Sequence, residues 1–188
     1  MKSFKLFLIL ALAGLILAPA CGVKTEPDQD RFTARMIVTQ GMKTAGMSGR
    51  LNITVNHWTT SEEKDKLFQA LQTGGEAALK MEIEKSDVGS FFPQGSTRWK
   101  LNYAVSTQTP EGQRIRLVTA RAIRFGEFKR VRESTQYEYG FVEFLLDENG
   151  QGEGRILPWV KIKINQRGML EIESLGTSPV RLMNVKRG

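Results

Sequence analysis

The sequence of 188 residues predicts an α+β fold that is mostly β, in which an antiparallel meander of about seven or eight strands forms a barrel or curved sheet. A helical insertion is expected after the second strand. Apolar and polar residues alternate over Leu51–Val55, which is typical of a strand with one buried face. From Thr97 onward, short alternating segments recur about every ten residues between turn residues, without a helical period.

The N-terminal half is expected to hold two strands and the helix. Segment 32–40 favours the first strand, the glycine-containing segment 41–49 favours a turn, and Leu51–Val55 is the second strand. These elements place one hairpin before the helical insertion.

A helix is expected over residues 61–72. Thr60 and Glu63 have the spacing of a capping box, and Gly74–Gly75 ends the helical pattern. The next segment, 76–85, is rich in strong helix formers, although its alternating apolar residues also fit a strand. A second helical segment is favoured there.

The C-terminal half is expected to consist of consecutive antiparallel strands. Pro110–Gly112 and Asp147–Gly150 are turn segments between them, and Pro158 indicates a bulge or an edge position inside its strand. The expected strands are Trp99–Val105, Ile115–Thr119, Tyr137–Leu146, Arg155–Ile164, Met169–Leu175 and Pro179–Val185.

The apolar phase of these strands is expected to line the interior. A filled core is favoured, and the alternative is a cavity that carries a small apolar ligand, as in lipocalin-like barrels. The expected interior residues are Trp99, Leu101, Tyr103, Ile115, Leu117, Ile162, Ile164 and the run Phe141–Leu146.

Residues 1–20 have the features of a secretory signal peptide. Two lysines precede the apolar run 6–17, and the small residues 18–20 follow it. The run is shorter than the roughly 20 apolar residues that a membrane span needs. We therefore expect an exported chain without a transmembrane helix, a flexible linker or anchor at 21–30, and a single β-rich domain at 31–188.

Cys21 is the only cysteine and directly follows these small residues. Its position resembles the lipobox of bacterial lipoproteins, in which the cysteine sulfur receives a diacylglyceryl group. Lipid attachment at Cys21 is favoured over plain cleavage after Ala20, although Ala18 and Pro19 depart from the usual motif.

The composition is that of a globular, mildly basic chain, with 27 Lys and Arg against 20 Asp and Glu. It excludes disordered and collagen-like chains, and the charge favours an anionic envelope surface over nucleic acid. Five cations occupy the polar phase of the expected strands. If the strands adjoin, they form one basic patch for lipid phosphates or anionic polymers, and the alternative is a solvated outer face. They are Lys100, Arg114, Arg116, Lys161 and Lys163.

No catalytic constellation is visible, so a non-enzyme without cofactor or metal is favoured. His57 is the only histidine and is expected to be a surface residue at a strand end, which leaves no His/Cys set for zinc or for a nucleophile–base pair. Two strand carboxylates could still act as a glycosidase-type acid and base. The candidates are Glu138, Glu143, Glu153, Glu171 and Glu173.

The acidic segment Asp147–Glu153 has part of the spacing of a calcium loop, with Gly152 in the sixth place. Pro158 stands where the bidentate glutamate should be, and strands flank the segment instead of helices. A glycine-rich hairpin turn is expected.

The chain from residue 33 to 187 resembles an uncharacterised family of exported bacterial proteins. The likeness rests on Gly74–Gly75 after a helix, on the G-x-G-E-G turn at 150–154 and on the closing strand Pro179–Val185. Members of that family have Thr-Asp-Arg-Pro where this chain has 119–122, so the acid is absent here. The resemblance implies a bacterial envelope setting and no known activity.

Together these observations predict a non-catalytic binding or structural module of the cell envelope, anchored to a membrane through lipid on Cys21. An anionic envelope surface or another envelope protein is the expected partner. The alternatives are a lipocalin-like carrier of a small hydrophobic ligand, a carboxylate-based hydrolase and a soluble secreted protein. The ligand, the membrane leaflet and the oligomeric state stay open.

Overall fold

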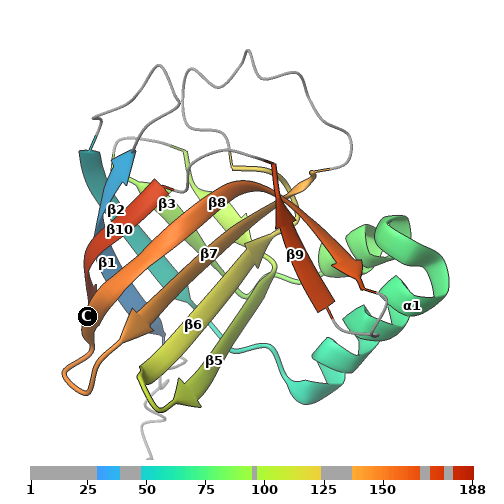
Figure 1. Ribbon diagram of the computed structural model, residues 1–188, viewed down its shortest axis with the longest axis horizontal. Helices are drawn as coiled ribbons and strands as arrows, with labels where there is room; N and C mark the ends of the chain where they lie inside the picture. The colour runs from blue at the N-terminus through green and yellow to red at the C-terminus, as the bar shows by residue number, and fades with distance from the viewer. Residues whose placement is uncertain (1–28, 39–47, 95–96, 124–136, 166–169, 176–179) are drawn as a thin grey trace, which may run out of the picture.

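The computed structural model describes residues 29–38, 48–94, 97–123, 137–165, 170–175 and 180–188. In this part of the chain, ten strands form one antiparallel, nearly closed barrel-shaped sheet, and a helix lies against its outside (Figure 1). The elements are β1 (Asp30–Val38), β2 (Ser48–Val55), α1 (Ser61–Ile83), β3 (Gly89–Pro93), β4 (Trp99–Leu101), β5 (Tyr103–Thr109), β6 (Gly112–Thr119), β7 (Tyr139–Leu146), β8 (Gln151–Ile164), β9 (Leu170–Ser174) and β10 (Val180–Arg187). The strand order is β4-β3-β2-β1-β10-β8-β7-β6-β5, and β9 pairs with β8.

The prediction of a mostly β, α+β fold with a helix after the second strand is confirmed. The described sheet has more strands than the seven or eight expected, for two reasons. Strand β3 is short, ends in Pro93 and has no alternating polar residues, so it gave no signal in the sequence. The expected strand Trp99–Val105 is divided at Asn102 into β4 and β5.

Asn102 connects the two ends of the sheet. The carbonyl of Leu101 accepts a hydrogen bond from Val88 N–H beside β3, whereas Asn102 N–H donates to Val118 O of β6, at 3.0 and 2.9 Å. The Asn102 side chain is buried and occupied at both ends: its Nδ2 donates to Ser86 O at 2.8 Å and its Oδ1 accepts from Ala120 N–H at 2.9 Å. This bend brings β4 and β5, at opposite ends of the strand order, next to each other.

Side chains fill the inside of the barrel. The inward phases of the strands contribute one continuous cluster of buried apolar residues, with Phe32 and Phe144 in an edge-to-face contact at 5.2 Å. Leu101, Ile115 and Leu117 belong to this cluster, as predicted, and are fully buried. Dense packing of this kind is what holds small β-barrels together.

The interior assignment was wrong for Tyr103, Phe141, Ile162 and Ile164. These residues belong to or pack against a second apolar cluster, outside the barrel and beneath α1. The bend at Asn102 changes which phase of the chain faces inward, so Ala104 is buried inside and Tyr103 is not. Val142 faces the inside of the barrel and Phe141 faces the outer cluster. The Tyr139–Leu146 strand is apolar on both faces because both of its faces are covered.

Strand β8 is longer than the barrel and leaves it near Pro158. The β7–β8 register shifts between Tyr139 and Phe141, opposite this proline, so the predicted bulge is confirmed. Beyond the bulge, Val160–Ile164 pairs with β9 instead of β10. The resulting β8–β9 extension reaches toward α1 (Figure 1), which places Ile162 and Ile164 outside the barrel.

Helix α1 begins at the predicted capping box, and the glycines that were expected to end it interrupt it with a kink instead. Thr60 and Glu63 form both hydrogen bonds of the capping box, and Gly75 interrupts the helix with a φ of 66°. The segment 76–83 continues as helix, so the helical prediction for it is confirmed. Leu71, Leu79 and Ile83 are buried against the outer face of the sheet.

The turn Asp147–Gly150 is a hairpin turn, as predicted, and Gly152 follows it where the backbone of β7 lies close to β8. A Cβ at Gly152 would lie 1.7 Å from Leu145 O, and one at Gly154 would lie 2.3 Å from Glu143 O. The G-x-G-E-G motif thus serves the close pairing of these two strands.

A cleft between the helix and the outer face of the barrel

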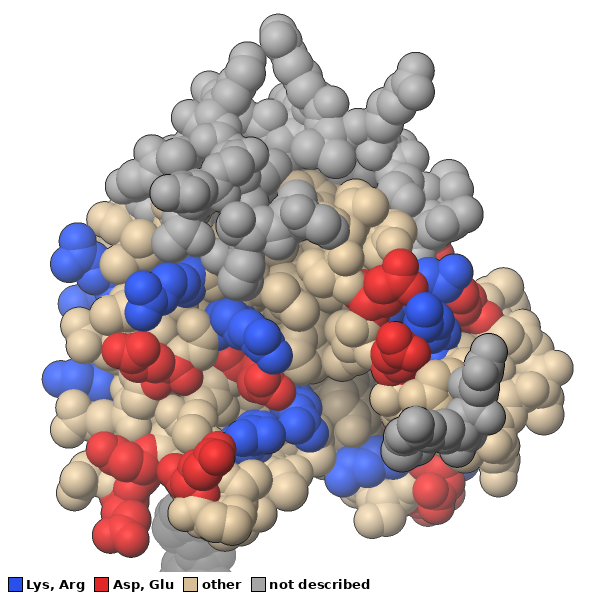
Figure 2. Space-filling view, viewed as in Figure 1, with Lys and Arg blue, Asp and Glu red and all other residues tan. Residues whose placement is uncertain are grey.

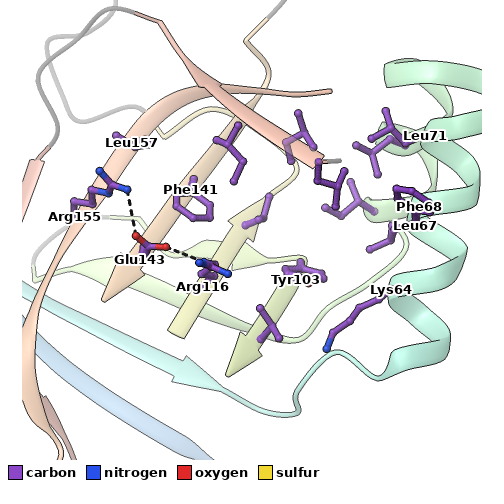
Figure 3. A pocket seen from close by; sticks show the side chains of 17 residues that line it. Lys64, Leu67, Phe68, Leu71, Tyr103, Arg116, Phe141, Glu143, Arg155 and Leu157 are labelled. Carbon is purple, nitrogen blue, oxygen red and sulfur yellow. Dashed lines mark hydrogen bonds and ion pairs between the residues drawn. The ribbon is translucent and has the colours of Figure 1, made fainter. Parts of the chain in front are cut away.

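A cleft of about 500 Å³ lies outside the barrel, where α1 faces strands β5 to β8 and the β8–β9 extension. Figure 2 shows the surface hollowed between these strands and the helix, and Figure 3 shows the side chains around it. Pockets of this size hold small molecules in other proteins. The fold forms the cleft because the kinked helix covers only part of the apolar outer face.

The floor and walls of the cleft are apolar. Val118 and Phe141 come from the sheet, and Leu71, Leu79 and Ile83 come from the helix. Two further large apolar side chains lie on β9, Leu170 and Ile172, and these remain 57% and 40% exposed. The wall formed by β9 therefore leaves much of its apolar surface exposed in the described chain.

Cationic side chains lie on both sides of the cleft, on the sheet and on the facing helix α1. Arg116 Nε and Arg155 Nη2 both contact the Glu143 carboxylate, at 2.8 and 3.2 Å (Figure 3). Two guanidinium groups share this one carboxylate, so the trio keeps one positive charge. Lys64 adds a second, because no carboxylate among the described residues pairs with it. Each guanidinium carries five N–H donors, so donors remain for an anion.

Tyr103 lies between the apolar floor and this charged rim. Burial raises the pKa of its hydroxyl, and the charge of Arg116 opposes that rise. The hydroxyl therefore stays protonated at neutral pH, where it can donate a hydrogen bond without carrying charge.

The predicted basic residues are placed on three separate parts of the sheet. Arg114 and Arg116 lie on β6, and Lys161 and Lys163 lie on the β8–β9 extension, where Glu171 and Glu173 face Lys163 at 4.0 and 2.7 Å. Arg114 pairs with Glu111 at 3.0 Å and Lys161 with Glu76 at 3.0 Å. Lys100 lies apart on β4 and donates to Glu84 O at 3.4 Å. Blue and red side chains accordingly alternate over the face in Figure 2.

The candidate carboxylates are likewise engaged with cations. Glu138 contacts Lys80 at 2.8 Å, Glu153 contacts Arg181 at 3.8 Å, and only Glu143 of the five lines the cleft. Hydrogen bonds from Lys163 and then Tyr137 lower the pKa of Glu173, so this carboxyl is an anion at neutral pH. His57 is exposed after β2, as expected. The structure does not bring two of the candidate acids into the cleft.

The cleft itself was not predicted from the sequence. Its apolar residues come from five strands and a helix, and only their arrangement in space reveals that they share a cavity. The one available signal was the apolar outward phase of Tyr139–Leu146, which indicates that something covers the strand from outside.

Comparison with protein-family models, curated proteins and solved structures found no match. Within the described residues, no helix has the length and apolarity to cross a bilayer. The same residues contain no group of three or more His, Cys, Asp and Glu side chains placed to hold a metal ion.

Proposed function

We propose that this protein is an exported, lipid-anchored binding protein of the cell envelope, and that its cleft holds an amphipathic small molecule with an apolar chain and an anionic head. The observation that carries the proposal is the combination in one cleft of a partly exposed apolar wall and two guanidinium groups that share a single carboxylate. The apolar wall favours binding of the ligand's apolar chain, because binding removes apolar surface of both from water. Charge-assisted hydrogen bonds from Arg116 and Arg155 favour the head.

The location differs from that of a lipocalin-like carrier. The inside of this barrel is filled by the cluster around Phe32 and Phe144, so the ligand would lie outside, between the sheet and α1. The hypothesis that the protein carries a small hydrophobic ligand is therefore retained, but the ligand is placed in the cleft and not inside the barrel.

Titration of the full chain with decanoate and with decanol tests the cleft by calorimetry. Decanoate is expected to bind about tenfold or more tightly than decanol, since the chains are equal and only decanoate offers a charged acceptor. Arg116→Met is expected to remove most of this difference. Leu170→Ser with Ile172→Ser is expected to weaken both ligands, because these exposed side chains contribute apolar wall and little to the fold.

Met81→Ser is the matched control, since Met81 is 70% exposed on α1 and does not line the cleft. It is expected to bind both ligands like the parent chain. Equal binding of decanoate and decanol by the parent, or equal losses in Met81→Ser and the β9 variant, would contradict the proposed cleft ligand.

The proposed anchor has its own test. Intact mass spectrometry of the chain, produced in a bacterial host with its own N-terminal segment, is expected to show an N-terminus at Cys21 with added diacylglyceryl mass. Cys21→Ala is expected to lack that mass. An unmodified Cys21 in the exported chain would refute the lipid anchor and leave a soluble exported protein.

A further inference from the structure

The charges on the strands are divided unevenly around the barrel. Strands β1, β2, β3, β4 and β10 carry seven cations and one acid, Asp30. Strands β5 to β9 carry five cations and four acids. The first group of strands, β1, β2, β3, β4 and β10, therefore lacks the carboxylates that balance the cations of the second group, β5 to β9.

Four of these seven cations lie on one outward face, here called the cationic face: Arg31, Arg35, Arg50 and Lys186. All four are exposed. Arg35 of β1 lies directly opposite Arg50 of β2 in the strand register. Like charges at such a position destabilise a sheet unless an anion lies between them.

No carboxylate among the described residues pairs with this face. Arg31 donates to the Gln29 side chain at 3.3 Å and Arg35 to Ser48 Oγ at 3.5 Å, both neutral acceptors. The single acid of these strands, Asp30, is engaged by Trp58 Nε1 at 2.9 Å and by Arg187 at 3.6 Å.

The cationic face is also hollowed. Arg35, Arg50 and Lys186 line a shallow depression of about 440 Å³ together with the hydroxyls of Thr33 and Ser48. Asn184 completes its rim from a bulged position in β10 with a φ of 51°. Three cations and two hydroxyls around one hollow are donors suited to phosphate oxygens.

We propose that the cationic face docks the domain on an anionic membrane, with lipid phosphate groups between Arg35, Arg50 and Lys186. This inference rests on the proposed lipid anchor for the choice of a membrane as partner. Eight residues separate Cys21 from Asp30, the first residue of β1, so this linker spans at most about 30 Å. An anchored domain would therefore stay close to the surface, where each cation strengthens binding about fivefold.

Co-sedimentation of the full chain with vesicles tests the face. Vesicles of phosphatidylcholine alone are compared with vesicles that contain phosphatidylglycerol, and the ratio of the two affinities is measured. The apolar N-terminal segment contributes to the affinity for both kinds of vesicle, so its contribution cancels in the ratio. Arg35→Glu with Arg50→Glu is expected to lower the preference for the anionic vesicles at least twentyfold.

Arg114→Glu with Lys163→Glu is the matched control, because it changes the net charge equally on the other half of the sheet. It is expected to change the preference less than threefold. Equal losses in both double variants would show that only net charge matters and would overturn the proposal. Binding of soluble glycerol phosphate at the face without any vesicle preference would overturn it in favour of a small-anion site.

The variants also separate this inference from the proposed cleft function. Arg35→Glu with Arg50→Glu is expected to bind decanoate like the parent chain, because neither residue lines the cleft. Loss of decanoate binding in Arg116→Met with unchanged vesicle preference would confirm that the two surfaces act independently. Loss of vesicle preference in Arg116→Met would contradict the assignment to the cationic face.

Discussion

Replacing Gly152 with alanine is expected to destabilise the fold by about 3 kcal/mol or more, since the added Cβ meets backbone that cannot move alone. An ideal Cβ there lies 1.7 Å from Leu145 O and 2.8 Å from Leu145 C, inside the β7–β8 pair. To remove this clash between the added Cβ and the Leu145 backbone, the two strands must separate or change register. Urea unfolding, followed by circular dichroism, measures the loss.

Gly49→Ala is the matched control for this prediction. Gly49 also lies within a strand, β2, but a Cβ there meets nothing within 4 Å. Its replacement is expected to change stability by less than about 1 kcal/mol, with a gain as the expected sign because the unfolded chain loses freedom. A Gly152→Ala chain as stable as Gly49→Ala would show that the β7–β8 pairing is looser than described.

Asn102→Ala is expected to cost about 2 to 5 kcal/mol, because it leaves one buried and one partly buried backbone group without a partner. These are Ala120 N–H and Ser86 O, which the Asn102 amide now joins across the closure of the barrel. The same loss should loosen the junction between β4 and β5. Urea unfolding again measures the free energy, and amide hydrogen exchange of Val88 and Asn102 reports on the junction.

Asn52→Ala provides the comparison, since Asn52 is half-buried on the outer face of β2. It is expected to cost less than about 1 kcal/mol, as surface substitutions usually do. A loss in Asn102→Ala that does not exceed the loss in Asn52→Ala would refute the role of Asn102 in closing the sheet.

The sequence predicted the parts of this fold that local patterns determine. The alternation over Leu51–Val55, the capping box at Thr60 and the turn at Asp147–Gly150 each depend on neighbouring residues, and all three are present. The bulge near Pro158 followed from the missing N–H of proline.

Other parts depend on contacts between distant residues. Asn102 looks like an ordinary polar position of an alternating strand, and its role appears only through Ser86 and Ala120. The outward direction of Tyr103 and the departure of Ile162 from the barrel follow from the same kind of long-range geometry. Period-two alternation assigns residues to two faces, but it does not report which face points inward.

The candidate sites also combine features that local sequence patterns predict with features that depend on contacts between distant residues. The polar phase of the strands correctly indicated outward cations, but it did not indicate where their partners lie. A carboxylate of the β5–β6 turn pairs with Arg114, one of α1 pairs with Lys161 and one of β9 pairs with Lys163. Arg35 and Arg50 instead lie opposite each other across β1 and β2. Cross-strand register decides which cations remain available to bind an anion, and a single sequence does not specify it.

The central claim is that the ligand lies in the cleft between α1 and the barrel, and methyl NMR of the full chain with decanoate tests it most directly. The account predicts shifts of the methyl signals of Leu67, Leu157 and Ile162, which line the cleft. It predicts unchanged signals for Ile115, Leu117 and Ile156, which fill the barrel. Shifts confined to the barrel interior, or no shifts at saturating decanoate, would contradict the proposed site.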